Sequence, residues 1–192
     1  MIYAITDDPG DFFQNRKAII KHYVSSAKNL SSSFFKDEFD RLESMDNPQE
    51  RGRQLDAFTG LLFQQLPNVK VRLDESTETG EVDVYIDCLE AEDWLQRMVG
   101  SHTMIENKWE KDPIETSEIS KFRQKTLDIH ACEAAYFLSM SGYSRGQRTQ
   151  TGSLHTLRSY EDPRMIDLWD DDLEKMIEDG SPKRALRERM TA

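Results

Sequence analysis

The sequence predicts an α/β fold in which a central mixed sheet is flanked by helices. Short apolar runs with strand-like alternation recur through the middle of the chain, and longer segments with helical periodicity precede, separate and follow them. One of these helices connects the third and fourth predicted strands. Such a helix is a crossover connection, which joins parallel strands, so the sheet is expected to be mixed.

Two amphipathic helices are predicted ahead of the sheet. Residues 11–29 carry apolar side chains at helical spacing, and a second stripe runs from Phe35 to Leu42 after a serine run that supplies N-cap candidates. Asn47-Pro48 ends this second helix. We interpret residues 1–48 as an N-terminal helical extension used for packing or dimerisation, and residues 49–192 as the main domain.

Helices and strands then alternate through the main domain. The predicted helices each have an apolar face and cover residues 50–66, 89–100, 116–129 and 171–179. The predicted strands are short runs rich in apolar residues and cover residues 69–73, 82–88, 103–108, 134–140 and 165–169. The polar segment 142–157 is expected to be a loop, and a basic amphipathic segment closes the chain.

Composition narrows the class of protein. A chain of 192 residues can form one domain with a sizeable core. The N-terminus lacks a signal-peptide pattern, and no apolar run is long enough to span a membrane. Cys88 and Cys132 follow no metal-binding spacing, which is typical of reduced thiols. We therefore expect a cytoplasmic protein with no membrane partner.

The charge distribution bears on nucleic-acid binding. A net charge of −11 argues against general affinity for a polyanion, because such affinity comes from Lys and Arg neutralising phosphates. The charge is uneven, since residues 71–100 are strongly acidic while residues 138–160 hold Arg145, Arg148 and Arg158 and no acid. Two interpretations stay open. Either a local basic loop meets phosphates while the acidic bulk limits indiscriminate binding, or the charge serves solubility alone.

An acidic residue lies inside the second predicted strand. Asp83 stands between Val82 and Val84, and a carboxylate in an apolar strand is costly unless it meets a metal or a cation. Strand alternation places Asp83, Tyr85 and Asp87 on one face. The same alternation places Val82, Val84 and Ile86 together on the opposite face.

The third predicted strand closes with Glu106-Asn107-Lys108. Glu106 and Lys108 share one face, and Asn107 points the other way. If this strand pairs with the preceding one, Asp83 and Glu106 can hold one hard cation such as Mg²⁺, with the Asn107 carbonyl as a third oxygen ligand. Lys108 would then orient the attacking water or offset negative charge in the transition state. The alternative is a salt-bridge cluster at the strand ends.

Through Asp83 and Glu106-Asn107-Lys108, the chain resembles the PD-(D/E)xK nuclease superfamily, and within it the Mrr-like restriction endonuclease branch. The resemblance covers residues 50–180 and is carried by segments in the same order along the chain. These segments are Arg51–Asp56, Gly80–Asp83, Glu106–Lys108, Ala135–Tyr143 and Ile166–Glu174. Two departures are the Asp at position 56, where many members have Glu, and the long insertion between the two catalytic strands.

The resemblance implies a restriction-endonuclease-like core that hydrolyses phosphodiester bonds in DNA with Mg²⁺ or Mn²⁺. It implies catalytic roles for Asp83, Glu106 and Lys108, a role for Asp56 at the metal site, and a function in antiviral defence or DNA processing. Gln124 in the crossover helix is a candidate for contact with a site ligand or phosphate, and Arg145 and Arg148 are candidates for contact with the DNA backbone.

Three further expectations concern partners and alternatives. A homodimer is expected, because two copies most simply cut both strands of a duplex, and a protein partner in a defence complex would direct a nuclease that lacks its own target-reading domain. The alternatives are a non-catalytic DNA-binding or scaffold subunit that keeps the nuclease fold, and a ribonuclease.

Overall fold

A computed structural model of the chain describes residues 28–144 and 152–191. The helix expected over residues 11–29 lies almost entirely outside these residues. Arg145 and Arg148 also lie outside them, so the structure places neither arginine.

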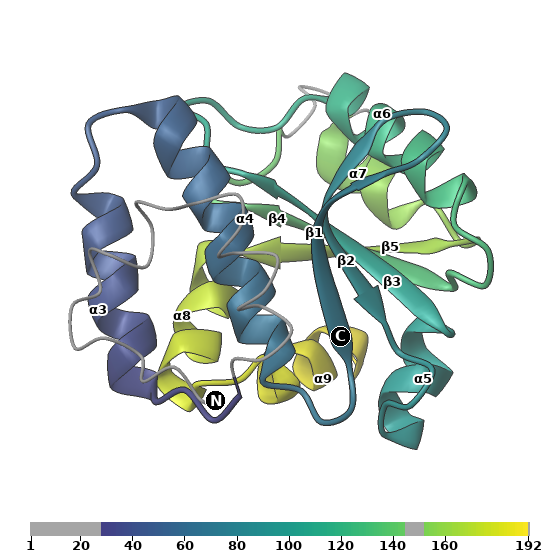
Figure 1. Ribbon diagram of the computed structural model, residues 1–192. Coiled ribbons are helices and arrows are strands. Elements are labelled where there is room, and N and C mark those ends of the chain that lie inside the picture. Colours follow the sequence, from purple (N-terminus) through teal and green to yellow (C-terminus); the bar gives the residue numbers. More distant parts are fainter. Residues whose placement is uncertain (1–27, 145–151, 192) are drawn as a thin grey trace.

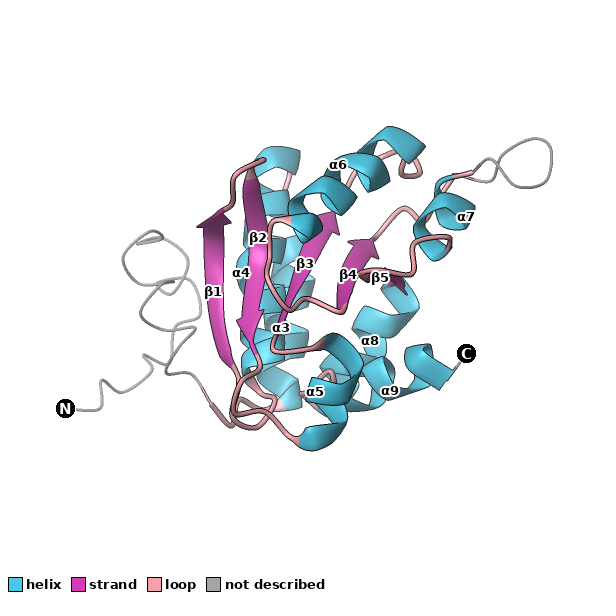
Figure 2. Ribbon diagram, turned by 90° about the vertical axis from the view of Figure 1, so that its right-hand side faces the viewer, coloured by secondary structure: helices cyan, strands magenta, loops and turns pink. Residues whose placement is uncertain are grey.

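The described residues contain a five-stranded mixed sheet with the strand order β1-β2-β3-β4-β5 (Figure 2). β1, β2 and β3 pair antiparallel, whereas β3, β4 and β5 pair parallel. The strands are β1 (Lys70–Ser76), β2 (Glu81–Asp87), β3 (His102–Lys108), β4 (Ala134–Ser139) and β5 (Arg164–Trp169). The expectation of an α/β core with a mixed sheet is therefore confirmed, and the change from antiparallel to parallel pairing falls at β3.

Helices cover both faces of the sheet (Figure 1). On one face α4 packs across β1, β2 and β3, and α3 and α8 lie beside it. On the other face α6 and α7 pack together, and α7 contacts β5. The helices are α3 (Ser32–Glu43), α4 (Pro48–Gln64), α5 (Asp93–Val99), α6 (Thr116–Leu127), α7 (Ser153–Arg158), α8 (Asp170–Asp179) and α9 (Lys183–Thr191).

Local sequence signals explain where the two helices at the start of the described region begin. The Ser31 hydroxyl accepts a hydrogen bond from the Phe34 N–H at the start of α3. At the start of α4 the Asn47 side chain accepts from two backbone N–H groups, and Pro48 occupies the first turn. The start of α3 lies where the sequence predicts it, whereas α4 begins at Pro48, two residues before the predicted residue 50, because Asn47 caps it.

The position of α4 depends on a close approach to the sheet. A Cβ added at Gly60 would lie 2.8 Å from Leu73 Cδ2, so a larger residue there would push α4 away from β1. Asp56 lies one turn before Gly60 on the same side of α4. The glycine therefore helps to hold Asp56 near the sheet.

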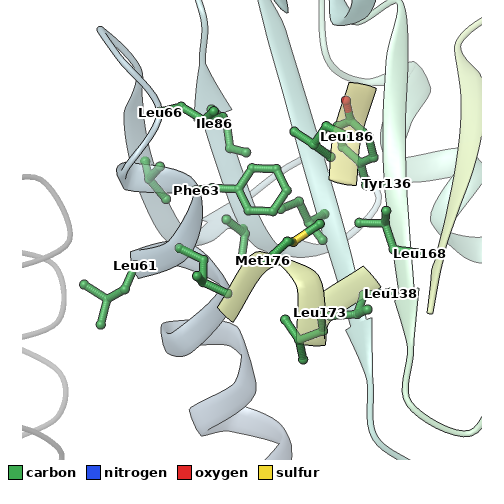
Figure 3. Close-up of a cluster of buried hydrophobic side chains, with 14 of the residues drawn as sticks. Leu61, Phe63, Leu66, Ile86, Tyr136, Leu138, Leu168, Leu173, Met176 and Leu186 are labelled. Atoms are coloured by element: carbon green, nitrogen blue, oxygen red, sulfur yellow. The ribbon is translucent and has the colours of Figure 1, made fainter. Parts of the chain in front are cut away.

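Two buried apolar clusters lie on the two faces of the sheet. The larger one joins α4 and α8 to the inner strands and contains Phe63, Tyr136 and Met176 (Figure 3). It also includes Phe35 and Leu42 of α3, so the helix expected in the N-terminal extension packs into the same core as α4. The smaller cluster joins α6 and α7 to the other face.

One segment differs from its predicted conformation. Residues 142–157 were expected to be loop, but Ser153–Arg158 form the short helix α7. Its buried contact is Leu157, which belongs to the smaller cluster. A helix of six residues is too short to show a clear helical period in the sequence, and the polar flanking residues mask it.

Candidate functional site

The candidate site forms where the pairing between β2 and β3 ends. The last paired residues of that ladder are Val84 and Ile105. Beyond them the Asp83 carboxylate, rather than the backbone of β2, accepts a hydrogen bond from the Asn107 N–H, with an Oδ2–N distance of 2.8 Å. The two strands are thus linked through an acidic side chain.

The same feature corrects the predicted alternation of β2. Val84 and Ile86 lie in the larger cluster as expected, but Val82 lies in the smaller cluster, on the opposite face of the sheet. The β2–β3 ladder stops at Val84, and on the other side of β2 the register skips Asp83 opposite Asp74, whose φ of 53° breaks the regular strand conformation. The prediction that Val82 shares a face with Val84 and Ile86 is therefore wrong.

The side chains at the end of β3 point to opposite faces, as predicted. The Lys108 Nζ lies 3.1 Å from Glu106 Oε1. Asn107 faces α4 instead, where its Nδ2 donates to Asp56 Oδ1 at 3.1 Å. The structure therefore brings together Asp56, Asp83, Asn107, Glu106 and Lys108, which come from three different elements.

Helix α6 adds a lysine to this group. The Lys125 Nζ lies 2.8 Å from Glu106 Oε2, so each oxygen of that buried carboxylate faces one ammonium group. Gln124, the candidate in the same helix, is exposed and makes no contact with the site in the described residues. A sequence signal for Lys125 exists, because it follows the buried Phe122 by three residues and so lies on the inward side of α6.

Burial raises the pKa of two acids in the site. The pKa of Asp56 rises to about 8, because burial and the neighbouring Asp83 both disfavour its charged form. Burial, followed by repulsion from Glu106, raises the pKa of Asp83 to about 7. For Lys108, burial acts to lower the pKa, but attraction to Glu106 and Asp83 outweighs it, so the net shift is upward.

The site places the two ammonium groups of Lys108 and Lys125 beside three carboxyl groups. Both lysines face Glu106 and also act to lower the pKa of Asp83, but burial and Glu106 outweigh them; Asp56 accepts a hydrogen bond from Asn107. A further cation would favour the charged forms of both aspartates. The buried Asn107 Oδ1 has no hydrogen-bond partner among the described residues, which leaves a further oxygen available there.

The chemistry of these groups fits a hard divalent cation. Carboxylate and amide oxygens are the ligands that Mg²⁺ uses in proteins, usually together with several waters. Within residues 28–144 and 152–191, however, no three His, Cys, Asp or Glu side chains stand together as a ready metal-binding group. Glu106 is directed to both lysines, so a cation at this site requires its carboxylate to move away from at least one of them.

No family model, curated protein or solved structure that was compared with this chain matches it. In the described part of the chain, every helix is too short or too polar to cross a membrane.

Proposed function

We propose that this protein is a divalent-metal-dependent nuclease that hydrolyses phosphodiester bonds in DNA. The observation that carries the proposal is the set of contacts around Asn107: its N–H donates to Asp83, its side chain donates to Asp56, and the neighbouring Glu106 and Lys108 form an ion pair. Clustered acids with raised pKa values are typical of functional sites. The resemblance of the same residues to the nuclease motifs supports the choice of reaction.

Each residue has a defined role in this proposal. Asp83 and Glu106 would hold Mg²⁺ or Mn²⁺, with an oxygen of Asn107, and Asp56 holds the Asn107 side chain through its amide. When bound, the metal supplies Lewis acidity and lowers the pKa of water. Lys108 keeps its proton because its pKa is raised, so its ammonium group can offset negative charge that develops on the phosphoryl oxygens.

The remaining parts of the proposal concern context. A restriction-endonuclease-like core, a homodimer that cuts both strands, a partner that directs cleavage and a role in defence follow from the resemblance and from the small size of the chain. The mixed sheet with helices on both faces is consistent with such a core.

A cleavage assay tests the reaction and the substrate together. Plasmid DNA and a structured RNA are each incubated with the full chain in Mg²⁺, in Mn²⁺ and in EDTA. We expect metal-dependent cleavage of the DNA, lost in Asp83→Asn and retained in Asp87→Asn, a matched change four residues along β2. Cleavage of the RNA alone would make the protein a ribonuclease, and cleavage that survives Asp83→Asn would refute the site.

One observation favours a second candidate, a non-catalytic DNA-binding subunit. Both oxygens of Glu106 are held by lysines, which is also the arrangement of a stable structural ion pair. Under this alternative the wild-type chain binds DNA in Mg²⁺ but does not cleave it at any metal concentration.

A further inference from the structure

We propose that Arg51 binds a backbone phosphate of duplex DNA beside the phosphate that is cleaved. This inference rests on the proposed nuclease function and names a contact that positions its substrate. Its basis is the contact between Arg51 on α4 and Trp109, the residue that follows Lys108.

The contacts between α4 and the end of β3 place Arg51 at the edge of the candidate site. Asp56 of α4 meets Asn107, and five residues earlier on the same helix the Arg51 guanidinium lies 4.7 Å from the centre of the Trp109 ring. The chain therefore runs from Asn107 through Lys108 to Trp109 alongside α4. Lys108 points to the opposite face of the sheet, so a nucleic acid that contacts both Lys108 and Arg51 would cross the end of β3.

The arginine is held on a fixed aromatic support. The rings of Trp109 and Phe39 are stacked, with centroids 5.7 Å apart and an interplanar angle of 17°. Phe39 in turn contacts Phe58, which is fully buried in α4. A guanidinium group held over an aromatic ring in this way loses less conformational freedom when it binds a ligand.

Arg51 has no anionic partner in the described part of the chain. Its guanidinium group makes no hydrogen bond or ion pair there, and its buried Nε is without an acceptor. The exposed Arg158 and the half-buried Arg189, by contrast, each bind carboxylates. In a chain with a net charge of −11, a fixed arginine without a carboxylate is available for an external anion.

The chemistry of the Arg51 guanidinium group favours a phosphate as the external anion. A planar guanidinium offers several N–H donors in a geometry that matches phosphate oxygens. Phosphate contacts position a nucleic acid on a protein without reading its sequence. Arg51 is accordingly expected to fix the register of the DNA on the site and not to select a base sequence.

The test is a binding titration in EDTA, where no cleavage is expected. A fluorescein-labelled duplex is titrated with the full-length wild type, Arg51→Gln, Arg51→Lys and Arg53→Gln, and the anisotropy is measured at several salt concentrations. Arg53 is the matched control, because it is an exposed arginine two residues along the same helix. Thermal unfolding of each variant confirms that it is folded.

We expect Arg51→Gln to weaken duplex binding about 10-fold and to reduce the salt slope by about 1, as loss of one phosphate contact does. Arg51→Lys should recover part of the affinity, and Arg53→Gln should bind as the wild type does. Equal affinity and equal salt slope for Arg51→Gln and wild type would overturn the inference, even if the wild type cleaves DNA in Mg²⁺.

The outcomes separate this inference from the proposed function. Duplex binding that depends on Arg51, without cleavage in Mg²⁺, would support the phosphate contact and refute the nuclease activity. A wild-type chain that does not bind the duplex at any salt concentration would overturn both.

Discussion

Two groups of acidic side chains lie at this sheet, and their surroundings are opposite. The first, called here the β2–β3 cluster, consists of Asp56, Asp83 and Glu106. The second, called the β5–α8 cluster, consists of Asp167 and Asp172, and both of these are buried. The two groups differ in how well positive charge and hydrogen-bond donors match their oxygens.

The β5–α8 cluster is fully supplied with donors. Arg158 binds both oxygens of Asp167, at 2.8 and 2.7 Å, and the Trp169 indole donates to the same carboxylate. Arg189 of α9 binds Asp172 and also approaches Asp167. Burial alone would raise the pKa of Asp167, but the hydrogen bonds from Arg158 and Trp169 outweigh it and lower the pKa.

In the β2–β3 cluster the effect of burial is larger than that of the hydrogen bonds. The pKa values of Asp56 and Asp83 are therefore raised. Burial of an acid does not by itself indicate function, because Glu106 in the first cluster and Asp167 and Asp172 in the second are all buried. The presence or absence of matching cations separates them. The arginines that bind Asp167 and Asp172 tie α7 and α9 to the sheet. In the proposed function, by contrast, the metal lies beside Asp83 and Asp56, whose pKa values are raised.

The largest expected effect is on cleavage by the β2–β3 cluster. Lys108→Met should lower the rate of DNA cleavage in Mg²⁺ about 1,000-fold, because it removes a cation from the place where negative charge develops. The rate is measured under single-turnover conditions. Lys111→Met, an exposed change three residues later, is the control, and an equal loss in both variants would mean that Lys108 acts through stability or general charge.

Substitutions in the β5–α8 cluster should change the free energy of unfolding and not the rate of cleavage. Arg189→Met leaves the buried Asp172 without its main cation, so we expect a loss of about 3 kcal/mol in the free energy of unfolding, measured in urea. Arg184→Met, on the same helix, removes an exposed ion pair with Asp179 and should have little effect on the free energy of unfolding. A similar small cost for both variants would remove the distinction between the two clusters.

Asp56→Asn should stabilise the protein at high pH. The pKa of Asp56 is raised from 3.8 to about 8, so the folded state binds this proton more tightly than the unfolded state. The free energy of unfolding therefore falls as the pH rises from 3.8 to about 8. The neutral variant should gain about 1–2 kcal/mol at pH 8 in EDTA and about 0 at pH 4.

Urea unfolding at the two pH values measures this difference. Asp87→Asn is the control, since Asp87 lies at the other end of β2 and binds only the Leu89 N–H among its described neighbours. A gain that is equal at both pH values would show that the substitution acts through packing and not through charge.

The smallest effect concerns added metal. Mg²⁺ at ten times its dissociation constant should stabilise the wild type by about 1.4 kcal/mol at pH 8.5, seen as a shift of several degrees in the thermal midpoint. The shift should shrink at pH 5.5, because Asp83 and Asp56 bind protons there, in competition with the metal. A shift that grows on acidification would contradict the proposed ligands.

The strand pattern was sufficient to predict much of this site. Asp83 was a candidate because it interrupts an apolar run. The alternation of β3 correctly predicted that Glu106 and Lys108 share one face of the strand and that Asn107 points to the other. These features depend on neighbours along one strand, so they can be derived from the order of residues. Asp56 entered only through the resemblance to a family, since a helix-surface acid has no distinctive spacing.

Other parts of the site depend on contacts between distant segments. Lys125 reaches Glu106 because the crossover returns α6 across the sheet, and the two residues lie 19 positions apart in the chain. The face of Val82 was predicted wrongly because a side chain replaces the backbone in the ladder beyond Val84. The pairing of Arg51 with Trp109 joins residues far apart in the chain, and periodicity within one element does not reveal such pairs.

The most direct test is calorimetric titration of Mn²⁺ into the metal-free chain at pH 8, compared with the same titration of Asp83→Asn. We predict that the wild type binds the ion with release of protons and that the substitution abolishes the binding, while Asp87→Asn binds as the wild type does. An absence of binding by the wild type, or equal binding by Asp83→Asn, would contradict the assignment of the β2–β3 cluster as a metal site.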